Sequence, residues 1–228
     1  MSKIILDSIL KTYKAAGRTI KVLDSISISF PEKGIIVIAG RSGVGKTTLI
    51  QIIAGLITPS SGSVFIDGVE ISRLGAYELA WFRRKKIGFK PQDPILIPQL
   101  SVIENVALPL LLNYVEKEKA FKAAKELLEE FELSERIYHK PNQLSGGEYE
   151  RVSVAQTIIG APPIVILDEP TAHLDLETSK KVANIIKRKQ RESNSVYIVT
   201  TIEESLIEGA DKIYYLFNGK LFEKPFNI

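Results

Sequence analysis

Residues 35–47 hold the feature that most restricts how this chain can fold: an unbroken apolar run that leads directly into a glycine-rich loop. Ile35–Ala39 is apolar throughout, as expected of a strand that is buried on both faces of a parallel sheet. After the loop, residues 47–56 have the pattern of a helix. A buried strand, a tight loop and a helix in this order predict one unit of a parallel α/β domain.

The loop itself, Gly40-Arg41-Ser42-Gly43-Val44-Gly45-Lys46-Thr47, matches the Walker A pattern for phosphate binding. Its glycines let successive backbone N–H groups point at phosphate oxygens, and the following helix adds unpaired donors at its N-terminus. Lys46 brings a positive charge to the β- and γ-phosphates, and the Thr47 hydroxyl can ligate Mg²⁺. The residues predicted to contact the nucleotide here are Gly40, Arg41, Ser42, Gly43, Val44, Gly45, Lys46, Thr47 and Thr48, and Lys46 is also predicted to act in catalysis.

A second apolar strand, Ile164–Leu167, delivers two acids at its end, Asp168 and Glu169, in a Walker B pattern. Strand ends of a parallel sheet lie side by side, and ligands bind beyond them. We therefore expect Asp168 to lie near Thr47 and to hold Mg²⁺ through water, with Glu169 as general base for the attacking water. The alternative, a pair of solvated or helix-capping acids, is weakened by the phosphate loop in the same chain.

The other strands predict a mostly parallel sheet with an antiparallel part near the N-terminus. Residues 25–30 alternate serine with apolar side chains, which indicates a half-buried antiparallel strand. Val196–Thr200 is a further buried strand, and Asn218-Gly219 between two apolar runs is a strong hairpin signal. Because buried strands alternate with predicted helices, we assign the chain to the α/β class.

The segment from residue 93 to residue 160 has a different texture. Prolines at 91, 94 and 98 mark an irregular loop, Ser101 and Glu104 have the spacing of a capping box, and residues 116–132 are rich in helix formers. We predict one domain over residues 1–228, with a core of residues 1–92 and 161–228 and an inserted helical subdomain of residues 93–160.

Composition limits the classes of partner. A formal charge of +3, from 30 basic and 27 acidic residues, is too weak to indicate nucleic-acid binding, and the basic run 83–86 is interpreted as a solvated helix end. No stretch approaches the roughly 20 apolar residues that a membrane-spanning helix needs. The longest candidate, Val102–Val115, is interrupted by Glu104 and Pro109. Any role at a membrane is therefore expected to depend on a partner protein.

The sequence Leu144-Ser145-Gly146-Gly147-Glu148, followed by Arg151, resembles the LSGG signature of the ABC ATPase family. Ser145, Gly146 and Gly147 open a predicted helix that runs to about residue 159, and such a helix start is a second anion-binding site. The resemblance implies a P-loop NTPase (RecA-like) core with an N-terminal antiparallel β subdomain and an inserted helical subdomain. It also implies that the signature of one subunit closes on the ATP held by another, in a head-to-tail dimer.

Further positions match the same family. The resemblance implies that Tyr13 stacks on adenine and that Gln92 is the Q-loop glutamine, which contacts Mg²⁺ or the attacking water and senses the membrane partner. Residues 172–175 match the D-loop, which crosses the dimer interface. Residues 102–110 look most like the lipoprotein-release and macrolide-efflux branch.

The resemblance implies an ATP-binding and ATP-hydrolysing subunit that uses Mg²⁺ and drives a transmembrane permease in trans. It would be peripheral, at the cytoplasmic face of the cell membrane. The second ABC ATPase subunit is either an identical or a different chain. We expect the permease to dock on the apolar stretch Ile95–Leu112 beside the Q-loop, although part of this stretch must form the insertion's own core. The sequence identifies neither the transported substrate nor the direction of transport.

The chain departs from the family at one position. A histidine normally follows the strand after Walker B, and here Ile202 stands in its place if the next acid is matched to Glu203, or Thr201 if the threonine is matched instead. Loss of one transition-state donor typically costs about 2.7–4 kcal/mol, or roughly 10²–10³ in rate. We predict slow hydrolysis with intact ATP binding. The alternative function is an ATP-dependent regulatory or assembly module with little turnover, and His173 remains a candidate donor across the dimer.

Overall fold

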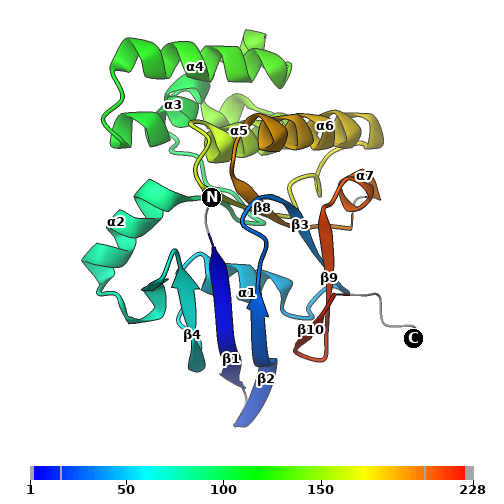
Figure 1. The fold of residues 1–228 in the computed structure, drawn as a ribbon. Coiled ribbons are helices and arrows are strands. Elements are labelled where there is room, and N and C mark those ends of the chain that lie inside the picture. Colours follow the sequence, from blue (N-terminus) through cyan, green and yellow to red (C-terminus); the bar gives the residue numbers. More distant parts are fainter. Residues whose placement is uncertain (1–2, 16, 203, 224–228) are drawn as a thin grey trace.

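The computed structural model describes residues 3–15, 17–202 and 204–223 and arranges them in two sheets with helices packed around them (Figure 1). The strands are β1 (Ile4–Ala15), β2 (Arg18–Ser29), β3 (Gly34–Ala39), β4 (Ser61–Ile66), β5 (Val69–Glu70), β6 (Ile87–Lys90), β7 (Ile164–Asp168), β8 (Val196–Thr200), β9 (Lys212–Phe217) and β10 (Lys220–Phe222). The α-helices are α1 (Lys46–Ile53), α2 (Ala76–Lys86), α3 (Val102–Leu112), α4 (Lys117–Glu130), α5 (Gly146–Ile158), α6 (Leu176–Glu192) and α7 (Glu204–Glu208), and short 3₁₀ turns cover Ile71–Arg73, Ser134–Arg136 and Pro141–Gln143.

The larger sheet has the order β10-β9-β3-β8-β7-β6 and is parallel from β9 to β6. The predicted buried strands are confirmed, because alternate residues of β3 enter different cores: Val37 packs toward the α3–α6 side and Ile38 toward α1 and the smaller sheet. The predicted hairpin is also present, since β9 and β10 pair antiparallel around Asn218-Gly219, both at positive φ. The α/β class is therefore confirmed.

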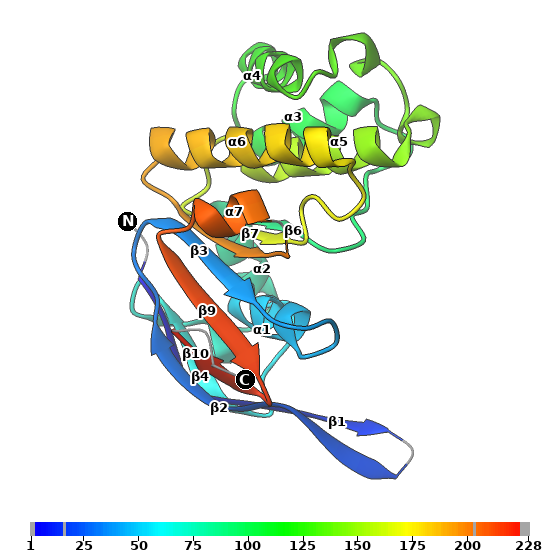
Figure 2. The ribbon, with the colours of Figure 1, turned by 90° about the vertical axis from the view of Figure 1, so that its right-hand side faces the viewer.

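The smaller sheet is antiparallel, with the order β2-β1-β4-β5, and it packs with α1 beneath the larger sheet (Figure 1). Its first strand, β1, was not predicted from the sequence. Ile4, Leu6 and Ile9 point into the core, but the register shifts after Leu6, next to Ser8 at φ +53°, and this irregularity breaks the period of two. The predicted strand 25–30 is part of a longer strand, β2, that begins at Arg18. This earlier start was not predicted because residues 18–21 are all exposed and therefore show no alternation of buried and exposed side chains. Figure 2 shows the β1–β2 hairpin projecting beyond the rest of the sheet.

Helices α3, α4, α5 and α6 form the layer on the other face of the larger sheet (Figure 1). The predicted capping box is present: Ser101 N–H donates to Glu104 Oε2 at 2.7 Å, and Glu104 N–H donates to Ser101 Oγ at 3.4 Å. Side chains of α3, α4 and α5 share one continuous core with β3, β7 and β8. The subdomain boundaries at residues 93 and 160 stay a prediction. In the described residues, every helix is too short or too polar to cross a bilayer.

Candidate functional site

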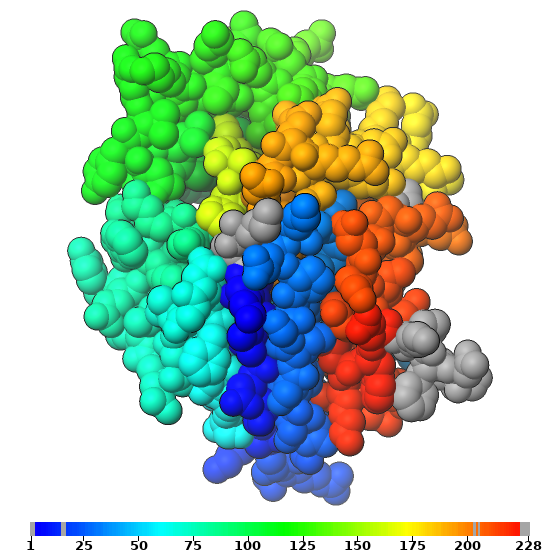
Figure 3. All heavy atoms as spheres, viewed as in Figure 1, coloured from blue at the N-terminus to red at the C-terminus, as the bar shows by residue number. Residues whose placement is uncertain are grey.

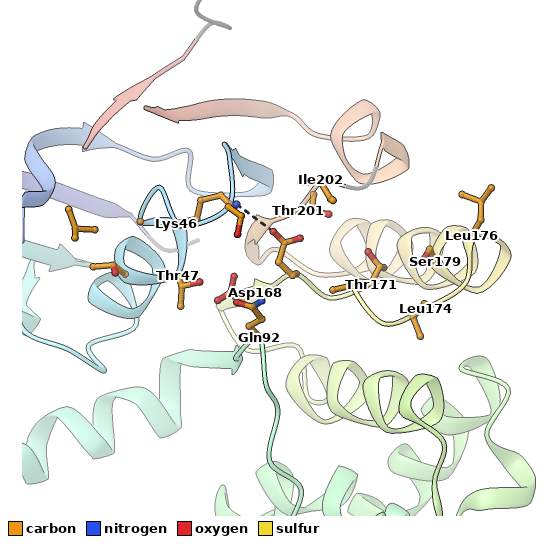
Figure 4. A pocket seen from close by; sticks show the side chains of 17 residues that line it. Lys46, Thr47, Gln92, Asp168, Thr171, Leu174, Leu176, Ser179, Thr201 and Ile202 are labelled. Atoms are coloured by element: carbon orange, nitrogen blue, oxygen red, sulfur yellow. Dashed lines mark ion pairs between the residues drawn. The ribbon is translucent and has the colours of Figure 1, made fainter. Parts of the chain in front are cut away.

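A cavity of about 740 Å³ opens at the carboxyl ends of β3, β7 and β8 (Figure 4). It brings together the phosphate loop, the acids after β7 and the segment after β8, which are far apart in the sequence. Its lining consists of Val22, Ser42, Gly43, Gly45, Lys46, Thr47, Thr48, Gln92, Asp168, Glu169, Thr171, Ala172, Leu174, Leu176, Ser179, Thr201 and Ile202. The predicted meeting of the two nucleotide motifs at one sheet edge is therefore found.

Two glycines of the phosphate loop hold conformations that other residues resist. Gly45 lies at φ +110°, and a Cβ there would stand 2.7 Å from Val22 Cγ1. Gly40 lies at φ +153°, and a Cβ there would stand 2.7 Å from the Leu216 carbonyl oxygen. The loop is thus packed against β2 and β9 as it turns into α1. Helix α1 begins at Lys46 without a side-chain cap, which leaves its first N–H groups facing the cavity for an anion.

Lys46 is nearly buried and is folded back onto its own loop. Its Nζ donates to the Gly40 carbonyl at 2.8 Å and to the Arg41 carbonyl at 3.3 Å. The same Nζ lies 3.6 Å from Glu169 Oε1, the ion pair marked in Figure 4. Gly40 and Arg41 therefore contribute backbone carbonyls that accept hydrogen bonds from Lys46. Val44 packs against the core instead of lining the cavity.

Asp168 is fully buried at the end of β7, and its two carboxylate oxygens differ in their contacts. Thr200 Oγ1 donates to Asp168 Oδ1, whereas Asp168 Oδ2 is buried with no hydrogen-bond partner among the described residues. A buried carboxylate oxygen without a partner is costly unless a cation or water satisfies it. The described residues contain no group of three or more His, Cys, Asp or Glu side chains that would hold a metal alone. The unpartnered Asp168 Oδ2 and the Thr47 hydroxyl in the same cavity fit Mg²⁺, which takes few protein ligands together with substrate phosphates and water.

Glu169 is held in a rare backbone conformation at the floor of the site. Its φ is +46°, in the left-handed region, and its N–H donates to the Thr200 carbonyl at 3.0 Å and to Thr200 Oγ1 at 3.1 Å. Thr200 thus contacts both acids. Strained backbone of this kind clusters at functional sites because the surrounding contacts must hold it.

The two candidate positions for the missing histidine differ sharply in exposure. Thr201 is buried, whereas Ile202 is 80% exposed, and both line the cavity on the side opposite Thr47 (Figure 4). Glu203, on which the alignment of Ile202 depended, lies outside the described residues. Gln92 is exposed and lines the cavity beside Asp168.

The signature does not belong to this cavity. Among the described residues that line it, none falls in the range 145–147. Ser145 instead caps α5, since its Oγ accepts from Glu148 N–H at 3.3 Å and Glu148 Oε2 accepts from Ser145 N–H at 2.8 Å. A Cβ on Gly146 would meet nothing within 4 Å. The start of α5 is therefore exposed at Ser145 and Gly146, while a Cβ on Gly147 would stand 3.3 Å from Leu174 Cδ2.

Tyr13 lies on β1 and is 43% exposed, with Lys11 Nζ 5.2 Å from its ring centre. It is not among the described residues that line the cavity, so its contact with adenine stays a prediction. Sequence reasoning missed several lining residues. Val22, Thr171, Leu176 and Ser179 carry no motif of their own, and only the fold brings them to the cavity. The neighbouring Glu169 and Asp175 were the sole sequence signals near three of them.

Comparisons with known proteins agree on one family. A family model described as "ABC transporter" matches residues 23–172. The chain is 38% identical over 221 residues to the lipoprotein-releasing system ATP-binding protein LolD 1 of Rhodopirellula baltica, covering 97% of this chain and 96% of that protein. It is also 38% identical over 222 residues to the uncharacterized ABC transporter ATP-binding protein MJ0796 of Methanocaldococcus jannaschii, covering 96% and 94% of the two chains.

Solved structures give the same result. The fold matches a dimeric, post-hydrolysis structure of the ATP-binding cassette MJ0796 bound to ADP and Pi, with a TM-score of 0.90 and 35% identity over 98% of this chain and all of that one. A second dimeric structure of MJ0796 matches with a TM-score of 0.91 and 36% identity over the same shares of the two chains. These matches confirm the predicted P-loop NTPase (RecA-like) fold with its antiparallel sheet.

Proposed function

This chain belongs to the ABC transporter family and is an ATPase of that family, and we propose that it drives a separate membrane permease through ATP-dependent, head-to-tail dimerisation. The observation that carries the proposal is the division of the site. One cavity gathers Lys46, Thr47, Asp168 and Glu169, while the second anion-binding terminus, at residues 145–147, lies outside it. A second subunit, whether an identical or a different chain, completes each site by bringing its signature to the open side.

Binding of ATP uses the phosphate loop and Lys46. The N–H groups at the start of α1 face the cavity and donate hydrogen bonds to the phosphates. Lys46 gives up its hydrogen bonds to the Gly40 and Arg41 carbonyls and donates to phosphate oxygens instead. Thr47, Asp168 and Gln92 would hold Mg²⁺, which supplies charge neutralisation of the phosphate oxygens when bound. The buried, unpartnered Asp168 Oδ2 supports this assignment.

Hydrolysis depends on Glu169 as the proton acceptor. In this form its carboxylate contacts Lys46, so the same movement that sends Lys46 to the phosphates frees Glu169 to orient a water and take its proton. The left-handed backbone of Glu169 and the two hydrogen bonds from its N–H to Thr200 fix the backbone position from which its carboxylate extends. Gln92 contributes a neutral amide that holds the same water or the metal.

We expect turnover to be slow. The exposed Ile202 side chain lines the cavity where the family has its histidine, and an alkyl group donates no hydrogen bond to a γ-phosphate. Burial of Thr201 favours position 202 over position 201 for this role. A loss of roughly 10²–10³ in rate is the usual cost of one such donor.

The permease would dock beside the Q-loop. Leu96 and the buried face of α3 belong to the core of the helical layer, but Ile95 is 84% exposed while Leu96 next to it is buried. Tyr77, Trp81 and Tyr114 form an exposed aromatic surface on α2 and just after α3, with Arg84 and Lys85 over the Tyr114 ring at 5.4 and 5.9 Å. In Figure 3 the segments of α2 and of the end of α3 lie side by side at the left edge. This apolar and basic surface suits an amphipathic, acidic helix of a membrane protein.

The curated relatives that release lipoproteins support a permease of the exporting or force-transmitting type and a peripheral location at the cytoplasmic face of the membrane. The second candidate function is an ATP-dependent regulatory or assembly module. The apolar side chain at position 202 favours it, because a weak site keeps ATP bound for longer.

Steady-state ATP hydrolysis by the purified protein tests both functions. We expect slow turnover in the wild type, none in Glu169→Gln, and an increase of at least about tenfold in Ile202→His, since the new imidazole restores a donor. A wild type without turnover, unchanged by Ile202→His, would support the regulatory module instead.

A further inference from the structure

A buried ion pair lies directly behind the site and is not used by the mechanism above. Lys90, the last residue of β6, has no exposed surface, and its Nζ lies 2.6 Å from Oε1 of Glu150, which is 2% exposed. The same ammonium donates to the Pro91 carbonyl at 3.1 Å and to the Asp168 carbonyl at 3.2 Å. The Lys90 ammonium therefore links the end of β6 to the end of β7 and to the second turn of α5.

Stability alone does not account for this arrangement. Removing an ammonium and a carboxylate from water is costly, and well-packed apolar side chains of similar size often stabilise a fold equally well or better. The remaining partly or fully buried positions of β6 are Ile87, Gly88 and Phe89, which carry no charge. A buried charged pair at the one strand position next to the Q-loop therefore points to a geometric role.

The loop between Lys90 and Leu96 is held at both of its ends by consecutive residues of one helix. Glu150 holds Lys90, and the neighbouring Tyr149 accepts a hydrogen bond at its hydroxyl from the Leu96 N–H at 2.7 Å. Gln92 lies between these two attachments. The second turn of α5 therefore sets the position of the loop that presents Gln92 to the cavity.

We propose that Lys90 and Glu150 are positioning residues, which hold the Gln92 loop and the end of β7 in a fixed place against α5. The proposal rests on the proposed ATPase function. Lys90 acts through the backbone of Pro91 and Asp168, and so it fixes where Gln92 and the Asp168 carboxylate stand. A displacement of the start of α5 by a partner subunit reaches the hydrolytic site through this contact.

The test compares Lys90→Met and Glu150→Met with the double variant K90M/E150M. Each single variant leaves one buried group unpaired and is expected to lower the melting temperature. The double variant replaces the pair with apolar side chains and is expected to recover part of the loss, because the Pro91 and Asp168 carbonyls still lack the donor that Lys90 supplied. The matched control is K181M/E132M, because the Lys181–Glu132 pair at 3.0 Å is exposed and neither residue is among the described residues that line the cavity. We expect the control to retain wild-type values throughout.

Three quantities separate positioning from packing in the double variant. We expect kcat to fall by at least about tenfold, the Kd for ATP without Mg²⁺ to change by less than about threefold, and the Mg²⁺ concentration for half-maximal activity to rise. A binding readout is independent of turnover: the extra rise in melting temperature that Mg²⁺ adds to ATP is expected in the wild type and lost in K90M/E150M.

Recovery of stability together with wild-type kcat and the full Mg²⁺-dependent thermal shift in K90M/E150M would overturn the proposal, because the pair would then be a packing element only. A wild type that binds Mg²⁺-ATP without hydrolysing it removes the proposed function, yet the thermal shift still decides between positioning and packing.

Discussion

At the scale of single residues, the polar side chains of the site differ in whether they already have hydrogen-bond or ion-pair partners. Lys46 is engaged with Gly40, Arg41 and Glu169, and Thr200 is engaged with both acids. The Asp168 Oδ2 atom stands without a partner among the described residues. Binding of ATP and a cation at this site would therefore exchange existing side-chain contacts for new ones.

Gly45→Ala should weaken nucleotide binding. An alanine at φ +110° is strained by about 1–3 kcal/mol, and its Cβ would press on Val22, so the loop must shift away from the phosphates. We expect the Kd for ATP to rise at least about tenfold, as measured by equilibrium dialysis or calorimetry. Val22→Ala in the same background removes the clash but not the backbone strain, so partial recovery is expected; an unchanged Kd in the single variant would contradict this reading of the loop.

At the scale of secondary-structure elements, α5 has two functions. Its first turn is an open, capped terminus, and its second turn carries Tyr149 and Glu150 to the Q-loop. Arg136 Nε donates to Glu148 Oε1 at 2.8 Å, and the Ser145 N–H donates to the same carboxyl, so the pKa of Glu148 is lowered to about 2. These contacts hold the Glu148 side chain against the start of α5.

Glu148→Gln should make the protein less stable at neutral pH. A folded pKa of about 2, below the unfolded value of 4.5, means that the ionised carboxyl stabilises the fold above pH 4.5 and that this contribution is lost as the pH falls toward 2. Partial exposure and screening reduce it to about 1–2 kcal/mol. Urea unfolding of wild type and variant at pH 7 and pH 3.5 should show the difference shrinking at the lower pH; a constant difference would refute the linkage.

Gly146→Ala should separate folding from dimerisation. A Cβ at this position meets nothing within 4 Å, so we expect the melting temperature to change by little. The added methyl would, however, stand where an ATP phosphate of the second subunit approaches the helix terminus. Hydrolysis should fall and lose its dependence on protein concentration. Wild-type kinetics in this variant would mean that the terminus is not part of an active site.

At the scale of the whole molecule, local patterns could be predicted and their assembly could not. Residues 35–39 and 164–167 were predictable because burial on both faces leaves a continuous apolar run. Strand β1 was missed because the shift beside Ser8 breaks its alternation. Val22 and Ser179 reach the cavity only through the fold, and Lys90 meets Glu150 sixty positions away. No local sequence pattern predicts contacts between residues so far apart in the chain.

The docking surface also belongs to this scale. Ile95→Asp places a charge on an exposed apolar side chain, so we expect an unchanged melting temperature and at least about a tenfold lower recovery of the membrane partner on co-purification. Glu118→Lys on the exposed face of α4 is the matched control. Equal recovery of the permease with both variants would move the docking site away from the Q-loop.

The most direct test of the central claim is the mass of Glu169→Gln in solution, measured by light scattering with Mg²⁺-ATP and with Mg²⁺-ADP. We expect twice the mass of one chain with ATP, the mass of one chain with ADP, and loss of the ATP dimer when Gly146→Ala is added. A single-chain mass with ATP, at concentrations where calorimetry shows the site to be filled, would contradict a site completed by two identical subunits and would direct the search to a different partner chain.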